Sequence, residues 1–319
     1  MKRVEAAYIL VLTHDIDVPT LVELPAGRTL AGFFYRCLAE NLVRFIRGHI
    51  SLEQYLRSIS AVVEYFRAKC GHGLDPWAKS LGIMLDMERS HEVRSTLFFI
   101  PICGEPGVMP SNFEESAPRN RAAYYRLDEY REVLEELVRG GWEVGVHGLN
   151  AWRSAEDAGR ELQAFEETCS AQQSVGIRMH WLYAREGMWK HLDEAGYAYD
   201  ASYGWNDRIG FPGGHYTPFR ADGTNNLMVL PLNIQDGALL GREHANLSPD
   251  RAWREVEKVL AEARRNHAVV TVLWHNTSFV APRFWGEVYE QILRQAKSDE
   301  AEVLTAGQAV ERFRDAELT

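Results

Sequence analysis

A chain of 319 residues with 46% hydrophobic and 25% charged residues has the composition of a globular protein with one substantial core. Its formal net charge of −10 argues against a general nucleic-acid binder, because phosphate contacts need concentrated Lys and Arg side chains. No apolar run is long enough to span a bilayer, and the start of the chain lacks the shape of a signal peptide. We therefore expect a single domain over residues 1–319, cytoplasmic, with no membrane span and no nucleic-acid partner. The cysteines are widely separated and are expected to be buried free thiols.

Short apolar runs alternate along the chain with longer helical patterns. The expected strands are residues 8–12, 96–100, 142–147, 176–181, 197–200, 228–232, 269–274 and 302–304. The expected helices include residues 51–68, 122–139, 155–169, 249–266, 282–296 and 306–314. This alternation is typical of a mostly parallel α/β sheet, either a barrel or an open doubly wound sheet. Residues 18–94 hold more helices than one crossover needs and predict an insertion over one end of the core, whereas residues 204–226 predict an irregular loop.

The first expected strand ends in the sequence Thr-His-Asp-Ile-Asp, residues 13–17. In an extended strand Thr13, Asp15 and Asp17 point to the same side, because side chains alternate. Two carboxylates held this close repel each other unless a cation or a proton lies between them. A divalent metal bound by one aspartate, with the other left as a base, would remove the repulsion. The alternative is a turn in which the two aspartates cap the segment that follows.

Three later strands also end in residues that can carry chemistry. One apolar strand ends at His147, another carries Arg178 and His180, and a third ends at His275. A single histidine at a strand end is more often a satisfied polar residue than a ligand. The carboxyl ends of parallel strands meet at one edge of a sheet, however, so four such ends together predict a site there.

In this order the segments resemble the motifs of the polysaccharide deacetylase (NodB-homology) family, carbohydrate esterase family four. Residues 13–17 resemble an Asp-x-Asp variant of its Thr-Phe-Asp-Asp-Gly opening, and residues 95–99 resemble its Ala-Thr-Phe-Phe strand. Residues 142–147 resemble the strand before its His-x-x-x-His motif. Residues 178–181 resemble its Arg-x-Pro-aromatic segment, and residues 273–275 resemble its Leu-x-His. Residues 303–307 are similar to its last strand and turn.

A subgroup with Thr-His-Asp-Val-Asp openings is closer still. Residues 195–202 and 207–211 are similar to its Ala-Gly-Phe-x-Tyr-Asp-Ser and Asp-Arg-Val-Gly-Phe segments. The resemblance covers nearly the whole chain apart from residues 18–94. It implies a distorted (β/α) barrel of seven or eight strands, with a helical insertion over residues 18–94 after the first strand.

The resemblance also implies a divalent metal, usually zinc, that activates water against an N-acetyl carbonyl. Asp15 would be the general base, and Asp17 and His147 would be metal ligands. Arg178 would orient Asp15 and keep it ionised. His275 would protonate the departing amine, a task suited to a side chain that titrates near neutral pH.

One departure from the family pattern concerns the metal. The family has a second histidine four residues after the first, where this chain has Ala151. One carboxylate and one histidine fall short of the three protein ligands of a typical catalytic zinc site. We hypothesise that His180, which stands where the family has proline, supplies the third ligand. The alternatives are His14 if the strand twists, His215 from the irregular loop, a purely structural role for His180, or loss of metal binding.

The implied activity is removal of an acetyl or similar acyl group from the amide nitrogen of a carbohydrate or a small glycoconjugate. One alternative is a hydrolase of a linear or cyclic amide that contains no sugar, and another is a degenerate, metal-free member that only binds carbohydrate. The sequence predicts no oligomeric state. The residues expected to contact the substrate are Trp181, Trp205, Asp207 and Trp274.

Overall fold

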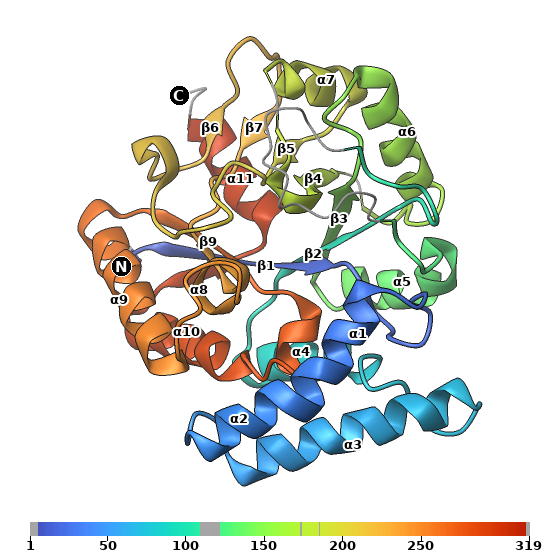
Figure 1. Cartoon of the computed structure of the whole chain (residues 1–319). Coiled ribbons are helices and arrows are strands. Elements are labelled where there is room, and N and C mark those ends of the chain that lie inside the picture. Colours follow the sequence, from blue (N-terminus) through green and yellow to red (C-terminus); the bar gives the residue numbers. More distant parts are fainter. Residues whose placement is uncertain (1–5, 109–121, 173, 185, 317–319) are drawn as a thin grey trace.

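A curled sheet of ten strands forms the centre of the molecule (Figure 1). The computed structural model describes residues 6–108, 122–172, 174–184 and 186–316. The strands follow the order β6-β7-β5-β4-β3-β2-β1-β9-β8, and β10 pairs with β1. Among the strand pairings of the described residues, that of β6 with β7 alone is antiparallel. The strands are β1 Ile9–Ile16, β2 Thr96–Phe99, β3 Glu143–Gly148, β4 Gly176–Met179, β5 Tyr199–Asp200, β6 Phe219–Arg220, β7 Met228–Val229, β8 Ile234–Gln235, β9 Val269–Leu273 and β10 Glu302–Leu304.

This architecture confirms the predicted distorted (β/α) barrel. Within the described part of the chain no pairing joins β6 to β8, the two ends of the strand path, so hydrogen bonds do not close the barrel. Eight strands lie where the sequence predicts them, which leaves two beyond the expected seven or eight. These two, β6 and β8, have two residues each. Strands β5 and β7 also have two residues each, but they lie within the longer apolar runs 197–200 and 228–232, whereas β6 and β8 lie in no such run. Strand β6 lies inside the segment that was expected to be wholly irregular.

Helices surround the sheet, and a few begin with recognisable signals. Ser51 and Gln54 form a reciprocal capping box at the start of α3, and Pro249 occupies the first turn of α9. The expected helix at residues 122–139 is shorter, because a 3-10 turn, Leu127–Tyr130, precedes α5. The α-helices are α1 Arg28–Tyr35, α2 Asn41–Ile46, α3 Leu52–Lys69, α4 Lys79–Ser90, α5 Arg131–Arg139, α6 Ala155–Glu166, α7 Met188–Ala195, α8 Asp236–Leu240, α9 Pro249–Asn266, α10 Gly286–Ser298 and α11 Ala306–Ala316.

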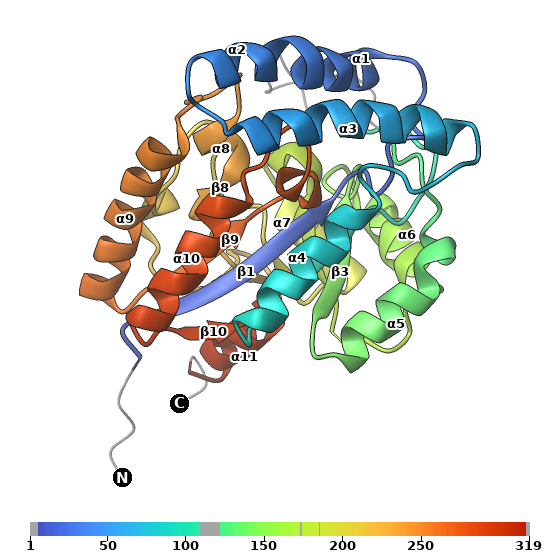
Figure 2. The same ribbon diagram turned by 90° about the horizontal axis from the view of Figure 1, so that it is seen from below.

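Helices α1 to α4 occupy the long segment between β1 and β2. A π-helical stretch, Arg36–Glu40, joins α1 to α2, so that the two run on as one rod beside α3 (Figure 2). Helix α4 buries Met84, Leu85 and Glu88 against the barrel and belongs to its helical layer. Of the four helices between β1 and β2, α1, α2 and α3 therefore stand outside the barrel. The division of the chain into one domain with an insertion stays a prediction.

The two faces of β1 pack against different parts of the core. Leu10, Leu12 and Ile16 face the apolar layer between sheet and helices, whereas Val11 joins Phe98 inside the barrel. Strand alternation carries Thr13 and Asp15 to the same side as Val11. The first strand thus delivers its polar end to the inside of the barrel.

All four cysteines are free. Cys37 and Cys169 are buried as expected, but Cys70 and Cys103 are exposed because both lie in segments outside the packed layers. No helix of the described residues has the length and apolar character needed to cross a membrane.

Gly176 at the start of β4 occupies a position where no larger residue fits. A Cβ atom there would lie 1.9 Å from the ring of Tyr199 on the neighbouring β5. We expect Gly176→Ala to lower the free energy of unfolding by about 1–3 kcal/mol, because the ring and the strand must move apart. Urea unfolding followed by circular dichroism measures this change.

The matched control is Gly159→Ala on α6, where no atom lies within 4 Å of the added methyl group. It should be neutral or stabilise the protein by up to about 1 kcal/mol, because alanine favours the helix. Equal stability of the two variants would contradict the close packing of β4 on β5.

Candidate functional site

The polar side chains predicted at four strand ends meet at one edge of the barrel. Each leaves the carboxyl end of a strand in the parallel part of the sheet, where loops of α/β folds commonly build sites. The contacts described below connect all of them. These residues are Asp15 and Asp17 from β1, His147 from β3, Arg178 and His180 from β4, and His275 from the end of β9.

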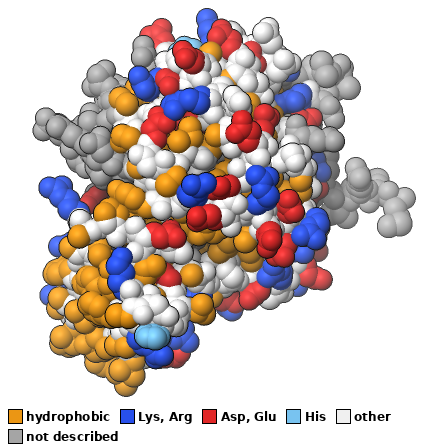
Figure 3. Space-filling model, turned by 90° about the vertical axis from the view of Figure 1, so that its right-hand side faces the viewer, with side chains coloured by type: hydrophobic (Ala, Val, Ile, Leu, Met, Phe, Trp, Pro, Cys, Tyr) orange, Lys and Arg blue, Asp and Glu red, His pale blue; other side chains and the backbone are white. Residues whose placement is uncertain are grey.

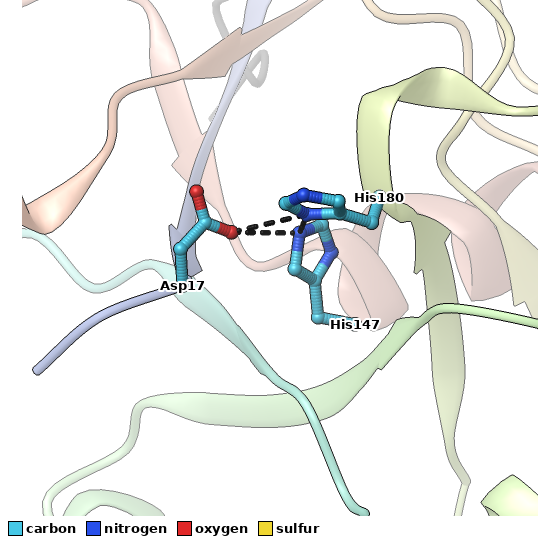
Figure 4. Close-up of side chains that lie close together, drawn as sticks. All are labelled: Asp17, His147 and His180. Carbon is cyan, nitrogen blue, oxygen red and sulfur yellow. Dashed lines mark hydrogen bonds and ion pairs between the residues drawn. The ribbon is translucent and has the colours of Figure 1, made fainter. Parts of the chain in front are cut away.

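Asp17, His147 and His180 form a cluster of potential metal ligands (Figure 4). Oδ1 of Asp17 lies 3.1 Å from Nε2 of His147 and 3.2 Å from Nδ1 of His180. The two imidazole nitrogens are 2.8 Å apart. Donor atoms that share one cation at about 2.0–2.1 Å are separated by about 3.0–3.4 Å, so this spacing is close to that of a ligand set.

The orientation of His147 is fixed by its neighbour strand. Its Nδ1 donates to the backbone carbonyl of Arg178 at 2.9 Å, so in the neutral ring the lone pair is on Nε2 and faces Asp17. This second hydrogen bond is the usual arrangement behind a metal-binding histidine. Burial lowers the pKa of His147, but the carboxylates of Asp15 and Asp17 act more strongly together and raise it.

The Asp17 carboxylate is the acceptor that the cluster leaves unsatisfied. Its Oδ1 is buried, and no donor among the described residues makes a well-directed hydrogen bond to it. Burial raises the pKa of Asp17, but the imidazoles of His180 and His147 outweigh burial and hold that pKa well below its usual range. A buried, ionised oxygen that faces two imidazole nitrogens is an arrangement that a cation would satisfy.

His180 reaches the cluster because the chain turns sharply after β4. Trp181 and Leu182 have positive φ angles of 61° and 53°, in the left-handed region that non-glycine residues rarely adopt. Nδ2 of Asn206 donates to the carbonyl of Trp181 at 2.8 Å and supports the turn. Strained backbone of this kind costs about 1–3 kcal/mol for each residue and is commonly found at functional sites.

Arg178 lies beside the cluster and is fully buried. Its Nη1 donates to Oδ1 of Asp15 at 3.2 Å and to Oγ1 of Thr13 at 2.6 Å, while its Nε donates to the carbonyl of Ala201 at 3.0 Å. The guanidinium lies over the ring of Phe98. Asp15 is thereby held through Oδ1, and its Oδ2 lies 3.8 Å from Nε2 of His147.

His275 belongs to a pair that sequence reasoning missed. Its Nδ1 lies 2.7 Å from Oδ1 of the fully buried Asp236, and its backbone N–H donates to the other carboxylate oxygen at 2.9 Å. Burial lowers the pKa of His275, but the Asp236 carboxylate raises it to about 9 overall. Burial raises the pKa of Asp236, but the charge of His275 lowers it to about 2. The second nitrogen of His275 lies 3.9 Å from Oδ2 of Asp17.

Asp236 carries the same signal as the other site residues, an acidic residue directly after a strand. That strand is β8, Ile234–Gln235, which is short and lies outside the apolar runs that mark the predicted strands. Ser278 also donates to the Asp236 carboxylate. His275 and Ser278 both lie in the loop after β9.

The residues expected to contact a substrate lie in different surroundings. Trp181 and Trp205 are half-buried, with Trp181 packed edge-on against His180 and Trp205 under the guanidinium of Arg208. Asp207 is exposed. Trp274 is fully buried and packs in the core, so its expected role in a sugar-stacking wall is wrong: strand alternation turns it away from the site.

Two alternative metal ligands are also corrected. His14 points to the opposite face of β1, where Nδ1 lies 2.6 Å from the Trp274 carbonyl and Nε2 lies 2.7 Å from the Glu88 carboxylate. The strand does not twist enough to bring it to Asp17. His215 stacks on Phe219 with ring centroids 4.0 Å apart and is not part of the cluster.

Comparisons with known proteins give a fold likeness and no sequence match. No family model matches the chain, and no curated protein matches it by sequence. A structure assigned as a polysaccharide deacetylase from Mycobacterium smegmatis has a TM-score of 0.57 and 15% identity, over 100% of this chain and 94% of that one. Puue allantoinase has a TM-score of 0.60 and 10% identity, over 98% and 92% of the two chains.

A third structure, assigned as a polysaccharide deacetylase from Pseudomonas aeruginosa PAO1, has a TM-score of 0.59 and 12% identity, over 98% and 92% of the two chains. These likenesses cover the strands that carry the site as well as the helices around them. The chain therefore shares its fold with these two polysaccharide deacetylase structures and with the allantoinase structure.

Proposed function

We propose that this protein is a metal-dependent amide hydrolase that removes an acetyl or similar acyl group from the nitrogen of a sugar-containing substrate. The observation that carries the proposal is the cluster of Asp17, His147 and His180. Beside it lie the Asp15 carboxylate, which Arg178 binds, and the pair of His275 and Asp236. Such a cluster combines metal ligands, a candidate base and a candidate acid within one small volume.

Zinc is the metal that we propose for the cluster. Two imidazoles and one carboxylate form a common set of protein ligands in hydrolytic zinc sites, and His180 would take the place of the histidine that Ala151 replaces. A bound zinc ion supplies a Lewis acid that polarises a carbonyl and lowers the pKa of water.

Asp15 is the residue that we propose as the general base. The Arg178 guanidinium and the strand hold its Oδ1, which leaves Oδ2 on the side of the cluster to accept a proton from the attacking water. Arg178 acts through Asp15 and is a positioning residue in this scheme. Because its guanidinium is fully buried and bound at three acceptors, it limits the movement of the carboxylate.

His275 is the residue that we propose as the general acid. Asp236 binds Nδ1 and keeps the ring positively charged, so Nε2 carries a proton on the side that faces Asp17. That proton is available to the amine nitrogen as its bond to the acyl carbon breaks. The raised pKa keeps the acid form present up to about pH 9.

We propose that the acyl group is attached to the amide nitrogen of a sugar, and that Trp181, Trp205 and Asp207 contact this sugar. Half-buried tryptophan rings offer flat apolar faces, and an exposed carboxylate offers acceptors for hydroxyl groups.

The fold likeness to Puue allantoinase supports a second candidate, hydrolysis of a linear or cyclic amide without sugar. Acetate release from N-acetylated sugars, compared with turnover of such amides, separates the two. Absence of turnover together with absence of bound metal would favour a carbohydrate-binding protein.

Removal of His180 tests the metal site. We expect the wild-type protein to bind about one equivalent of zinc, and His180→Ala to bind it more than about 100-fold more weakly, since even outer contacts of zinc ligands are worth about 10–100-fold. Dialysis against buffered zinc followed by elemental analysis measures the affinity. Zinc should also raise the melting temperature of the wild type and leave that of the variant unchanged. His244→Ala, at an exposed position outside the cluster, is the control.

Removal of the Asp15 carboxylate tests the base. Asp15→Asn keeps the shape of the side chain, and we expect it to lower kcat by about 10²–10⁴-fold with little change in zinc content. Asp86→Asn on the exposed side of α4 should leave both quantities unchanged. If Asp15→Asn retained wild-type kcat, another group would have to be the base.

The Asp236–His275 pair predicts a specific change in pH dependence. Because Asp236 raises the pKa of His275, replacing it with asparagine lowers that pKa, and the acid form is lost at lower pH. We therefore expect the alkaline limb of the kcat profile to move to lower pH in Asp236→Asn. Asp193→Asn, remote from His275, should leave that limb in place. An unmoved alkaline limb in Asp236→Asn would mean that His275 is not the acid.

A further inference from the structure

The two rods outside the barrel, α1–α2 and α3, form a layer with a well-packed inner face. Phe34 stacks on Phe66 and Phe45 stacks on Tyr55, so the rods run antiparallel side by side. The inner face packs on the loop after β9. Its buried apolar residues are Phe33, Cys37, Ala61 and Tyr65, together with Trp77, Val280 and Ala281.

The outer face of the same layer is also apolar. It carries nine of the thirteen exposed large hydrophobic side chains of the described residues, each between 39% and 72% accessible. Their spacing of three or four residues places them along one side of each rod. Figure 3 shows hydrophobic side chains gathered at the end of the molecule where α1, α2 and α3 lie in Figure 1. This outer stripe consists of Tyr35, Leu38, Leu42, Val43, Ile46, Leu52, Leu56, Val63 and Phe66.

An apolar patch of this extent on a monomer marks a surface for another molecule. A helix that only packs on a core needs one apolar side, but each of these rods has two. The inner side already accounts for the stability of the layer, because it buries Phe33, Tyr65 and Trp77. Apart from the stacking of Phe66 on Phe34, packing among the described residues gives no reason for the outer stripe.

The charge of the layer indicates which partner fits. Residues 27–74 contain seven Arg or Lys and three acidic residues, although the whole chain has a formal net charge of −10. Arg28, Arg47 and Arg67 are exposed. Arg47 and Arg67 come four residues after Val43 and Val63 of the stripe, a spacing that places them on the same side of the helices. A two-fold contact between two copies of this face would bring like charges together, whereas an anionic lipid surface complements it.

We propose that the outer stripe docks the protein on an anionic lipid bilayer, with the two rods lying in the plane of the interface. Amphipathic helices with apolar side chains on one face and basic residues beside them bind bilayers in this way, without crossing them.

The docked layer is joined to the candidate site. Nε1 of Trp77 donates to the Ala281 carbonyl at 3.0 Å and Nδ2 of Asn41 donates to the Pro282 carbonyl at 3.0 Å, both in the loop that follows His275.

Sedimentation of the full chain with vesicles tests the docking. We expect binding to vesicles of phosphatidylglycerol and phosphatidylethanolamine that weakens as salt is added, and at least about tenfold weaker binding to phosphatidylcholine vesicles. The triple variant Ile46→Ser, Leu56→Ser, Val63→Ser should lose binding to both. Arg47→Gln with Arg67→Gln should bind the anionic vesicles about 25-fold more weakly, since each basic residue near such a surface contributes about fivefold.

The matched control is Val108→Ser with Tyr124→Ser, which removes exposed hydrophobic side chains outside the stripe and should bind as the wild type does. Circular dichroism and thermal melting of each variant establish that it is folded. The docking readout is independent of hydrolysis, so Asp15→Asn should also bind vesicles normally even though its activity is lost.

Three results would overturn the proposal. They are failure of the wild type to bind anionic vesicles, unchanged binding by the folded serine variant, and a dimer that the serine substitutions convert to monomer without any vesicle binding. The last result would identify the outer stripe as a contact between two copies of the chain.

Discussion

The buried guanidinium and backbone of Arg178 connect both halves of the candidate site. Its carbonyl accepts the proton on Nδ1 of His147 and so turns Nε2 toward Asp17. Its side chain binds Asp15, Thr13 and the Ala201 carbonyl, which ties the end of β1 to the ends of β4 and β5. A buried charge with several acceptors is costly to disturb, because loss of any partner leaves part of that charge unpaired. The positions of the proposed base and of one proposed ligand thus depend on one residue.

The opposite face of β1 has its own buried polar network. His14 contacts the Glu88 carboxylate, which also accepts from Ser95, Trp142 and Tyr289. These contacts attach the carboxyl end of β1 to α4, to α10 and to the residues around β2 and β3. Because every oxygen of Glu88 has donors, burial of the carboxylate is compensated. The strand that carries Asp15 and Asp17 is therefore held from both sides, a requirement for a site whose atoms must keep positions within about half an ångström.

The site and the helical layer share the loop after β9. That loop begins with His275 and Ser278, which bind Asp236. It continues to Ala281, which accepts a hydrogen bond from Trp77 just before α4, and to Pro282, which accepts one from Asn41 of the layer. Contact between the layer and a partner would thus act next to the proposed acid, through residues adjacent in the chain. Apolar packing and hydrogen bonds make this connection within a single conformation of the protein.

Most of the fold and six of the site positions could be predicted because their signals are local. Apolar strands with polar ends are readable from alternation and composition, and the parallel sheet follows from their separation by helices. The six positions are Asp15, Asp17, His147, Arg178, His180 and His275. Strands β6 and β8 give no such signal because, unlike the equally short β5 and β7, they are not part of a longer apolar run, and Asp236 was missed with β8.

The sequence by itself determined which side chains stand at the strand ends and which chemistry they can perform. Only the tertiary structure decided which of them meet. The approach of His180 to His147 depends on two left-handed residues after β4, a conformation that a non-glycine residue adopts only when surrounding contacts impose it. The burial of Trp274 and the exposure of the outer stripe likewise depend on which face of a strand or helix meets the core. Apolar residues on either face look alike in a sequence, because burial is a property of the neighbours that the fold supplies.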